Sequence, residues 1–196
     1  MICAKRNCAY ALLTVLFICL QNSKALCKEG KNLNTENTTT RITSDTVDRF
    51  QWHEHNKLSW DDFRGDVAAS NDESAAATYC AIGFKTNTTA PGNKEIIVYN
   101  TFYTNKSWVR SDAKISSILE HEQGHFDLCE IYTRKLRDRM SKFDCNAPNV
   151  MQSLMSVYTA INNEYETRQQ AYEQETIHGT NIEQQKRWGE MIAREL

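Results

Sequence analysis

The sequence lacks a block of basic residues and lacks a long apolar run. Its 23 Lys and Arg are slightly outnumbered by 25 Asp and Glu, so the formal net charge is −2. Nucleic-acid binding needs clustered positive charge, so this chain is expected to have no nucleic-acid partner. The longest apolar run, residues 9–20, is too short for a comfortable membrane span. We therefore expect no stable membrane insertion of the mature chain.

The short apolar run instead predicts a secretory signal at residues 1–25. Lys5 and Arg6 precede the run, and Ser23 and Ala25 place small residues at the expected cleavage positions. An uncleaved anchor is the alternative. Removal of this segment takes away three cations and no acids, so the net charge falls from −2 to −5. The sequence thus predicts a secreted protein, extracellular or periplasmic.

Two further regions are expected after the signal. Residues 26–48 are rich in Asn and Thr and nearly free of large apolar side chains, which predicts a flexible polar leader. Residues 49–196 are long enough to form one domain with its own core.

The cysteines fit export into an oxidising space but match no zinc-ribbon spacing. The mature chain would retain four of them: Cys27, Cys80, Cys129 and Cys145. An even number predicts two disulfides with three possible connectivities, and four free thiols are the alternative.

One five-residue segment carries a specific chemical signal, the HExxH pattern at residues 121–125. On a helix, residues four apart share a face, so His121 and His125 can reach the same metal ion. Glu122 then lies beside the ion, placed to take a proton from water. Two imidazoles and a third protein ligand are the typical set around a catalytic Zn²⁺, which keeps one position open.

The context of this segment predicts a long helix. Residues 113–140 contain no Pro, and their only Gly is Gly124, inside the motif. His121, His125, Leu128 and Tyr132 follow one stripe at helical spacing, so the histidines point toward the apolar side. Polar side chains on a buried face require partners, which favours a metal site over two solvated histidines.

The remaining pattern predicts strands followed by helices. Residues 58–65 read as one helical turn, with Ser59 and Asp62 forming a capping box. Strands are expected at Tyr79–Thr86 and Glu95–Thr104. Substrate could pair with the second of these as an added edge strand. A long apolar stripe after Pro148 and a capping box at Thr180 predict two more helices. The expected fold class is α+β, with a small antiparallel sheet packed on the HExxH helix and C-terminal helices after it.

Several residues compete for the third metal ligand. His178 is favoured because it lies at the junction of two expected helices, where Gly179 lets the chain turn. Glu175 and Asp144 remain alternatives. His53 and His55, which would share one face of a strand, are a weaker possibility.

Residues after the motif suggest how the histidines are oriented. Asp127 and Glu130 are candidates to accept the second N–H of an imidazole. Leu128 and Ile131 occupy the positions where the metzincin pattern needs Gly and His, so that pattern is absent.

Three segments together resemble a known family. They are Leu58–Gly65 (LSWDDFRG), His121–Asp127 (HEQGHFD) and Tyr172–Gly179 (YEQETIHG). Their sequence and order are similar to those of a family of secreted bacterial proteins of unknown function, suspected to be zinc-dependent proteases. The resemblance extends from about Leu58 to the C-terminus.

This resemblance implies roles for particular residues. It implies His121 and His125 as metal ligands and Glu122 as the catalyst, and it supports His178 as the third ligand. The family's final motif is similar to Tyr-Asp-x-x-Thr-x-His-Gly, and Glu173 stands at its Asp position in this chain.

The sequence therefore predicts a zinc-dependent, zincin-like peptidase that acts on peptide or protein substrates. Zn²⁺ is the expected cofactor, and Glu122 is the expected general base. Tyr172 is a candidate donor to the oxyanion that forms during peptide hydrolysis. The alternative is an inactive metal-binding or disulfide-stabilised secreted interaction protein. The sequence leaves the oligomeric state open.

Overall fold

The computed structural model describes residues 48–67, 74–90 and 92–196. Residues Thr43–Leu196 belong to one compact unit. The expected signal at 1–25 and all of the expected leader except Asp48 lie outside the described residues.

The β-structure consists of two small antiparallel sheets. The first is three-stranded with the order β1-β4-β3, and the second pairs β2 with β5. The strands are β1 (Arg49–Phe50), β2 (Ala76–Ala77), β3 (Cys80–Ala90), β4 (Asn93–Tyr103) and β5 (Trp108–Val109). With the helices that follow, this makes the fold α+β, as the sequence predicts.

A long hairpin dominates the three-stranded sheet. β3 and β4 pair from Cys80 opposite Phe102 to Ala90 opposite Asn93, so both expected strands are confirmed. Each extends further toward the turn than expected and is one residue shorter at its other end. β4 lies between β1 and β3. The expectation that it would serve as an edge strand is therefore wrong where β1 pairs with Phe102 and Tyr103.

Three helices follow the strands: α1 (Ser116–Met140), α2 (Val150–Thr176) and α3 (Ile182–Glu195). All three were expected from the apolar periodicity. The α3 cap differs by one residue, because Asn181 rather than Thr180 accepts from the N–H of Gln184, at 3.2 Å. The Thr180 hydroxyl instead donates to the carbonyl of Ile177. In the described part of the chain, no helix is long and apolar enough to cross a membrane.

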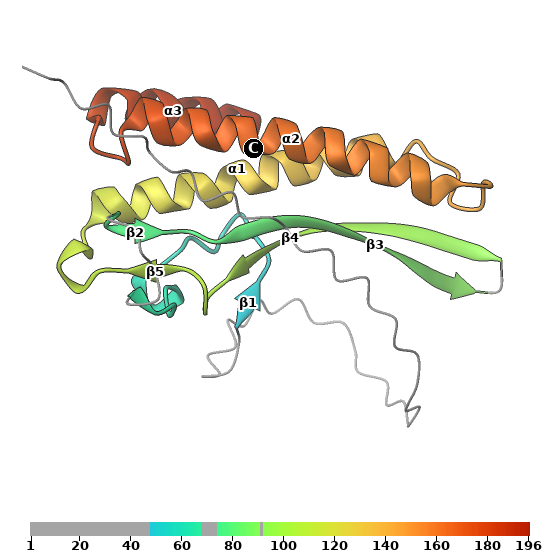
Figure 1. Ribbon diagram of the computed structural model, residues 1–196, viewed down its shortest axis with the longest axis horizontal. Coiled ribbons are helices and arrows are strands. Elements are labelled where there is room, and N and C mark those ends of the chain that lie inside the picture. The colour runs from blue at the N-terminus through green and yellow to red at the C-terminus, as the bar shows by residue number, and fades with distance from the viewer. Residues whose placement is uncertain (1–47, 68–73, 91) are drawn as a thin grey trace, which may run out of the picture. The chain divides into compact units, whose positions relative to one another are not determined.

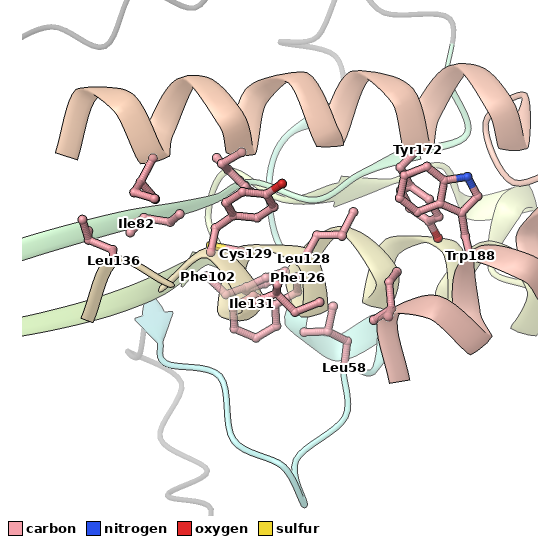
Figure 2. Packing of buried hydrophobic residues seen from close by; sticks show 14 of the residues in the cluster. Leu58, Ile82, Phe102, Phe126, Leu128, Cys129, Ile131, Leu136, Tyr172 and Trp188 are labelled. Carbon is pink, nitrogen blue, oxygen red and sulfur yellow. The ribbon is translucent and has the colours of Figure 1, made fainter. Parts of the chain in front are cut away.

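α1 is the central element of this unit. The three helices lie on one side of the strands, and α1 lies between the strands and α2 with α3 (Figure 1). Phe126 on α1 is fully buried, and its ring centroid lies 5.3 Å from that of Phe102 and 5.9 Å from that of Phe50. Figure 2 shows this packing of α1 on the sheet. Burial of such a side chain stabilises the fold by about 1.5–3 kcal/mol.

The chain before β2 packs on α1 through polar contacts. Its 3₁₀ turn, Trp60–Asp62, is capped by Asp62, whose carboxylate accepts from the N–H of Ser59 at 2.8 Å. The capping box expected at this turn is thus confirmed. The carbonyl oxygen of the Gln123 side chain on α1 accepts from the N–H of Leu58 at 2.7 Å.

Two buried acids on α1 complete this attachment. Asp127 accepts from Trp52 Nε1 at 2.6 Å, from Gln123 Nε2 at 2.7 Å and from Lys57 Nζ at 3.3 Å. Glu130 accepts from Asn100 on β4 and from Arg134. We call these two carboxylates and their donors the anchoring cluster.

The described cysteines are free thiols. They are Cys80 on β3, Cys129 on α1 and Cys145 in the loop between α1 and α2. No disulfide joins any two of these three, and Cys27 lies outside the described residues.

Candidate metal centre

Helices α1 and α2 bring three metal-ligating side chains together. His121 and His125 come from α1, and Glu173 comes from the last turns of α2. The Nε2 atoms of the two histidines lie 3.1 Å apart, and each lies 3.0 Å from Oε2 of Glu173. Among the residues that the structure describes, this is the group of His, Cys, Asp and Glu that converges closely enough to hold a metal ion.

The spacing of these three atoms suits a small divalent cation. Zn²⁺ binds imidazole nitrogen and carboxylate oxygen at about 2.0–2.2 Å, so tetrahedral ligands lie about 3.3–3.6 Å apart. The observed separations of 3.0–3.1 Å are a few tenths of an ångström shorter than this range. His121, His125 and Glu173 therefore fit a zinc ion in donor type and, within that difference, in spacing.

Hydrogen bonds fix the His121 ring in the form that can bind a metal. The Tyr172 hydroxyl donates to the His121 carbonyl at 3.1 Å, so the hydroxyl oxygen accepts from Nε2 of Gln185, at 2.7 Å. This orients the Gln185 side chain with Oε1 toward His121 Nδ1, 3.1 Å away. Nδ1 must then donate, which leaves the lone pair of Nε2 free for a cation.

Gln169 fixes the His125 ring in the same way. Its Nε2 donates to the His125 carbonyl at 2.9 Å, so its Oε1 faces His125 Nδ1, at 2.6 Å. Gln169 lies four residues before Glu173 on α2, as His121 lies four before His125 on α1. The same face of each helix therefore contributes two of these side chains.

Tyr172 holds the two rings against each other. It is fully buried, stacks on His121 with ring centroids 4.8 Å apart, and meets the edge of His125 at 4.9 Å. This approach requires Gly124, because a Cβ there would lie 2.2 Å from the Tyr172 hydroxyl. The hydroxyl hydrogen of Tyr172 is donated to the His121 carbonyl. In this arrangement Tyr172 therefore has no hydrogen to donate to an oxyanion, the role that the sequence suggested. Figure 2 shows Tyr172 beside Trp188.

Glu122 differs from the other buried acids of α1. It is 4 % exposed, and its Oε2 has no hydrogen-bond partner within the described residues. An unpaired buried carboxylate oxygen is destabilising unless something absent from the protein chain contacts it. Glu122 lies three residues before His125, so both point to the same side of α1. Glu122 thus lies on the side of α1 that carries His125, and its charge acts to raise the pKa of that histidine.

The charges at this cluster are strongly coupled in the metal-free chain. Burial lowers the pKa of His125, but the hydrogen bond to Glu173 and the charges of Glu122 and Glu173 outweigh it, raising that pKa to about 9. Burial likewise acts to raise the pKa of Glu173, but hydrogen bonds from His121 and His125 hold it well below its usual range. In the metal-free chain, Oε2 of Glu173 therefore pairs with a protonated His125 at neutral pH.

His178, the expected third ligand, lies outside the converging group. Its Nδ1 contacts the other carboxylate oxygen of Glu173, Oε1, and its side chain is 63 % exposed. The third side chain of the converging group is Glu173. The sequence offered a signal for this, because Glu173 stands at the acidic position of the family motif and lies four residues after Gln169.

Thr176 and Gly179, the remaining residues of the family motif, also make contacts near His121. Thr176 is fully buried, and its hydroxyl donates to the Tyr172 carbonyl at 2.7 Å and accepts from the N–H of Gly179 at 3.3 Å. Gly179 has φ +76° and packs on His121, where a Cβ would lie 2.9 Å from the His121 Cβ. The motif therefore describes one turn that closes over the first histidine.

The other sequence candidates do not join the group. Glu175 accepts from Trp188 Nε1 at 2.8 Å, and Asp144 accepts from the N–H of Asn146 in the loop after α1. His53 and His55 are exposed.

The residues expected to orient the histidines also prove to be different ones. Asp127 and Glu130 belong to the anchoring cluster and contact neither ring. Gln169 and Gln185 take that role. Sequence alone gave no reason to choose these amides, because α2 and α3 carry several glutamines.

Thr78 and Tyr79 join β2 to β3, and the chain there contacts the HExxH residues of α1. The Thr78 hydroxyl donates to the Glu122 carbonyl at 3.2 Å, and Cys80 Sγ lies 3.7 Å from the His125 carbonyl. Tyr79 directs its N–H and C=O toward Ser107 and Tyr103. Since alternate residues of an extended segment direct their main-chain groups to opposite sides, those of Thr78 and Cys80 face away from Ser107 and Tyr103, and at Cys80 toward the outer edge of β3.

Comparison with protein families adds one match. The family described as bacterial protein of unknown function (DUF922) matches residues 72–179, more than half of the chain. The chain belongs to this family. The match includes His121–His125 and ends at Gly179, whereas Leu58–Gly65 lies outside it. The expected resemblance to a bacterial family of unknown function is thus confirmed. No curated protein and no solved structure matches the chain.

Proposed function

We propose that this chain is a zinc-dependent peptidase with a zincin-like arrangement of its HExxH helix. One observation carries the proposal: His121, His125 and Glu173 converge with Nδ1 of both histidines already engaged, and Glu122 on the same helix has an unpartnered carboxylate oxygen. A structural metal site has no use for such an acid. A hydrolytic site needs it as a base.

The proposed roles follow from the contacts. His121, His125 and Glu173 would hold the cation. When bound at a site with an open position, Zn²⁺ makes water more acidic and polarises a carbonyl group. Glu122 accepts a proton from the attacking water and passes it to the leaving amine. Gln169, Gln185 and Tyr172 hold the rings in place.

The substrate proposed for this site is an extended peptide. The main-chain groups of Cys80 face the outer edge of β3, and the side chains of Thr78 and Cys80 contact the carbonyls of the HExxH residues. An extended segment that pairs with this edge would pass beside α1 at Glu122 and His125. This edge replaces β4 in the role expected from the sequence.

The proposal is tested by metal content and by hydrolysis, both measured on the full chain. We expect one zinc per chain by elemental analysis, and cleavage of a broad peptide library that stops when a chelator is added. The Glu122→Gln variant should retain zinc and lose cleavage.

Two outcomes would overturn the peptidase. A chain that binds no zinc at micromolar concentration would remove the metal site. A chain that binds zinc but cleaves no library peptide, with or without Glu122, would indicate a metal-binding module without catalysis.

A further inference from the structure

Three nitrogen atoms surround the carboxylate of Glu173, and they divide between its two oxygens. Oε2 contacts Nε2 of His121 and Nε2 of His125. Oε1 contacts Nδ1 of His178. An ionised carboxylate only accepts hydrogen bonds, so Nδ1 of His178 is the donor.

The backbone that places His178 is conformationally unfavourable. Ile177, His178 and Gly179 have φ values of 50°, 55° and 76°, three consecutive left-handed residues. The left-handed conformation is unfavourable for a non-glycine residue, and for a β-branched residue such as Ile177 it is rare.

Several hydrogen bonds hold this turn. The N–H of His178 donates to the Glu173 carbonyl at 3.1 Å, and the N–H of Asn181 donates to the Thr176 carbonyl at 2.8 Å. The result is that the ring of His178 folds back onto a side chain five residues earlier. The left-handed backbone at Ile177 and His178 lowers stability, yet it is what brings His178 to Glu173. This suggests that the contact between the two side chains has a function.

We infer that His178 is a positioning residue that occupies Oε1, so that Glu173 presents a single oxygen, Oε2, to a cation. A carboxylate that offered both oxygens would bring zinc and its bound water from four ligands to five, away from the four-coordinate set of a hydrolytic site. The inference rests on the proposed function, because it assumes that the three ligands bind zinc. It gives His178 a task other than that of a ligand.

Two variants separate the side-chain contact from the backbone strain. His178→Gly removes the ring and relieves the left-handed backbone. His178→Asn keeps a donor near the place of Nδ1, and Asn also tolerates positive φ. His55→Asn, at an exposed residue away from the site, is the matched control.

Zinc affinity of the full chain, measured by competition with a chromophoric chelator, is the first readout. We expect His178→Gly to weaken binding by about 10–100-fold, the usual effect of losing a group that orients a ligand. We expect His178→Asn and His55→Asn to bind like the parent chain. The melting temperature of the metal-free His178→Gly chain should not fall.

The visible spectrum after Co²⁺ is added in place of zinc is the second readout. Four-coordinate Co²⁺ absorbs more strongly than five-coordinate Co²⁺, so the bands should weaken in His178→Gly and persist in His178→Asn. A His178→Gly chain with the parent's zinc affinity and cobalt spectrum overturns this inference and leaves the proposed function standing. Equal weakening in both variants also overturns it, because the donor would then be irrelevant. A parent chain that binds neither metal overturns both.

Discussion

Two sets of buried acids on α1 contrast in how their oxygens are used. In the anchoring cluster, Asp127 receives three side-chain N–H donors and Glu130 receives two. One turn earlier, Glu122 has an oxygen with no partner in the described chain. Both sets are desolvated, so the difference does not come from burial. Satisfied buried carboxylates attach elements to one another, whereas an unsatisfied one on the same helix as converging ligands indicates a site for something else.

Glu122→Gln should give the largest effect and tests the functional side of this contrast. Loss of the general base is expected to reduce peptide cleavage by about 10²–10⁴-fold, while zinc content stays the same. The stability of the metal-free chain should not fall, since no hydrogen bond to Oε2 is lost. Turnover and elemental analysis on the same preparation are the measurements. Undiminished cleavage by this variant would sink the mechanism.

Glu173→Gln should have the next largest effect and tests the ligand assignment. Loss of the charged ligand is expected to lower zinc affinity by more than about 100-fold, beyond the usual effect of losing a residue that only orients a ligand. Glu175→Gln, two residues along the same helix and bonded to Trp188, is the matched control and should bind zinc like the parent. Chelator competition distinguishes them. Equal zinc affinity in the two variants would contradict the role of Glu173.

Asp127→Asn tests the structural side. It places an N–H donor opposite the donors of Trp52, Gln123 and Lys57, so the free energy of unfolding should fall by about 1–3 kcal/mol. Zinc affinity should not change, because Asp127 contacts neither ring. Urea unfolding and chelator competition are the two measurements. An Asp127→Asn chain that loses zinc but keeps its stability would contradict the structural role given to the anchoring cluster.

Gly124→Ala has two opposing effects on stability, a gain in helix propensity and a clash with Tyr172 beside the proposed metal site. Alanine gains about 1 kcal/mol of helix propensity over glycine. Its Cβ would lie 2.2 Å from the Tyr172 hydroxyl, and such overpacking costs about 1–3 kcal/mol. We expect the clash to win, with lower stability and weaker zinc binding. Gly189→Ala on α3, where a Cβ meets nothing within 4 Å, should show only the gain. Stabilisation of both variants would mean that Tyr172 does not need its close approach.

The pH dependence of zinc binding tests whether zinc competes with a proton at the metal-free site. His125 has a pKa raised to about 9 in the metal-free chain, so zinc must displace one proton at neutral pH. Apparent affinity should rise about tenfold per pH unit between pH 6 and 8.5 and level off above about 9. Because the folded pKa lies above the unfolded value of 6.5, the stability from this proton is complete below pH 6.5 and is lost toward pH 9. Calorimetry of the metal-free chain checks that second trend.

Local pattern was enough to predict much of the fold. The apolar stripes at helical spacing identified α1, α2 and α3, and the turn signal at Pro91-Gly92-Asn93 separated β3 from β4. The pair His121 and His125 was predictable because both lie on one helix, where a spacing of four fixes a shared face.

The rest of the site depends on how separate elements pack and on one unusual turn. Whether Glu173 or His178 joins the pair is decided by left-handed residues at Ile177 and His178, which sequence patterns do not predict for non-glycine residues. The contacts of Gln169 and Gln185 depend on the packing of α2 and α3 on α1. The edge at Cys80 follows from the strand order, which the alternation of apolar residues does not determine.

The ligands of the proposed metal come from two helices, and this has a mechanical consequence. Two are on α1 and one is near the end of α2, so a bound ion would act as a cross-link between them. The melting temperature of the chain should then rise with free zinc concentration, following mass action. Without the ion, the rings and the carboxylate still bond to one another, so chelation should loosen the end of α2 without collapsing the domain.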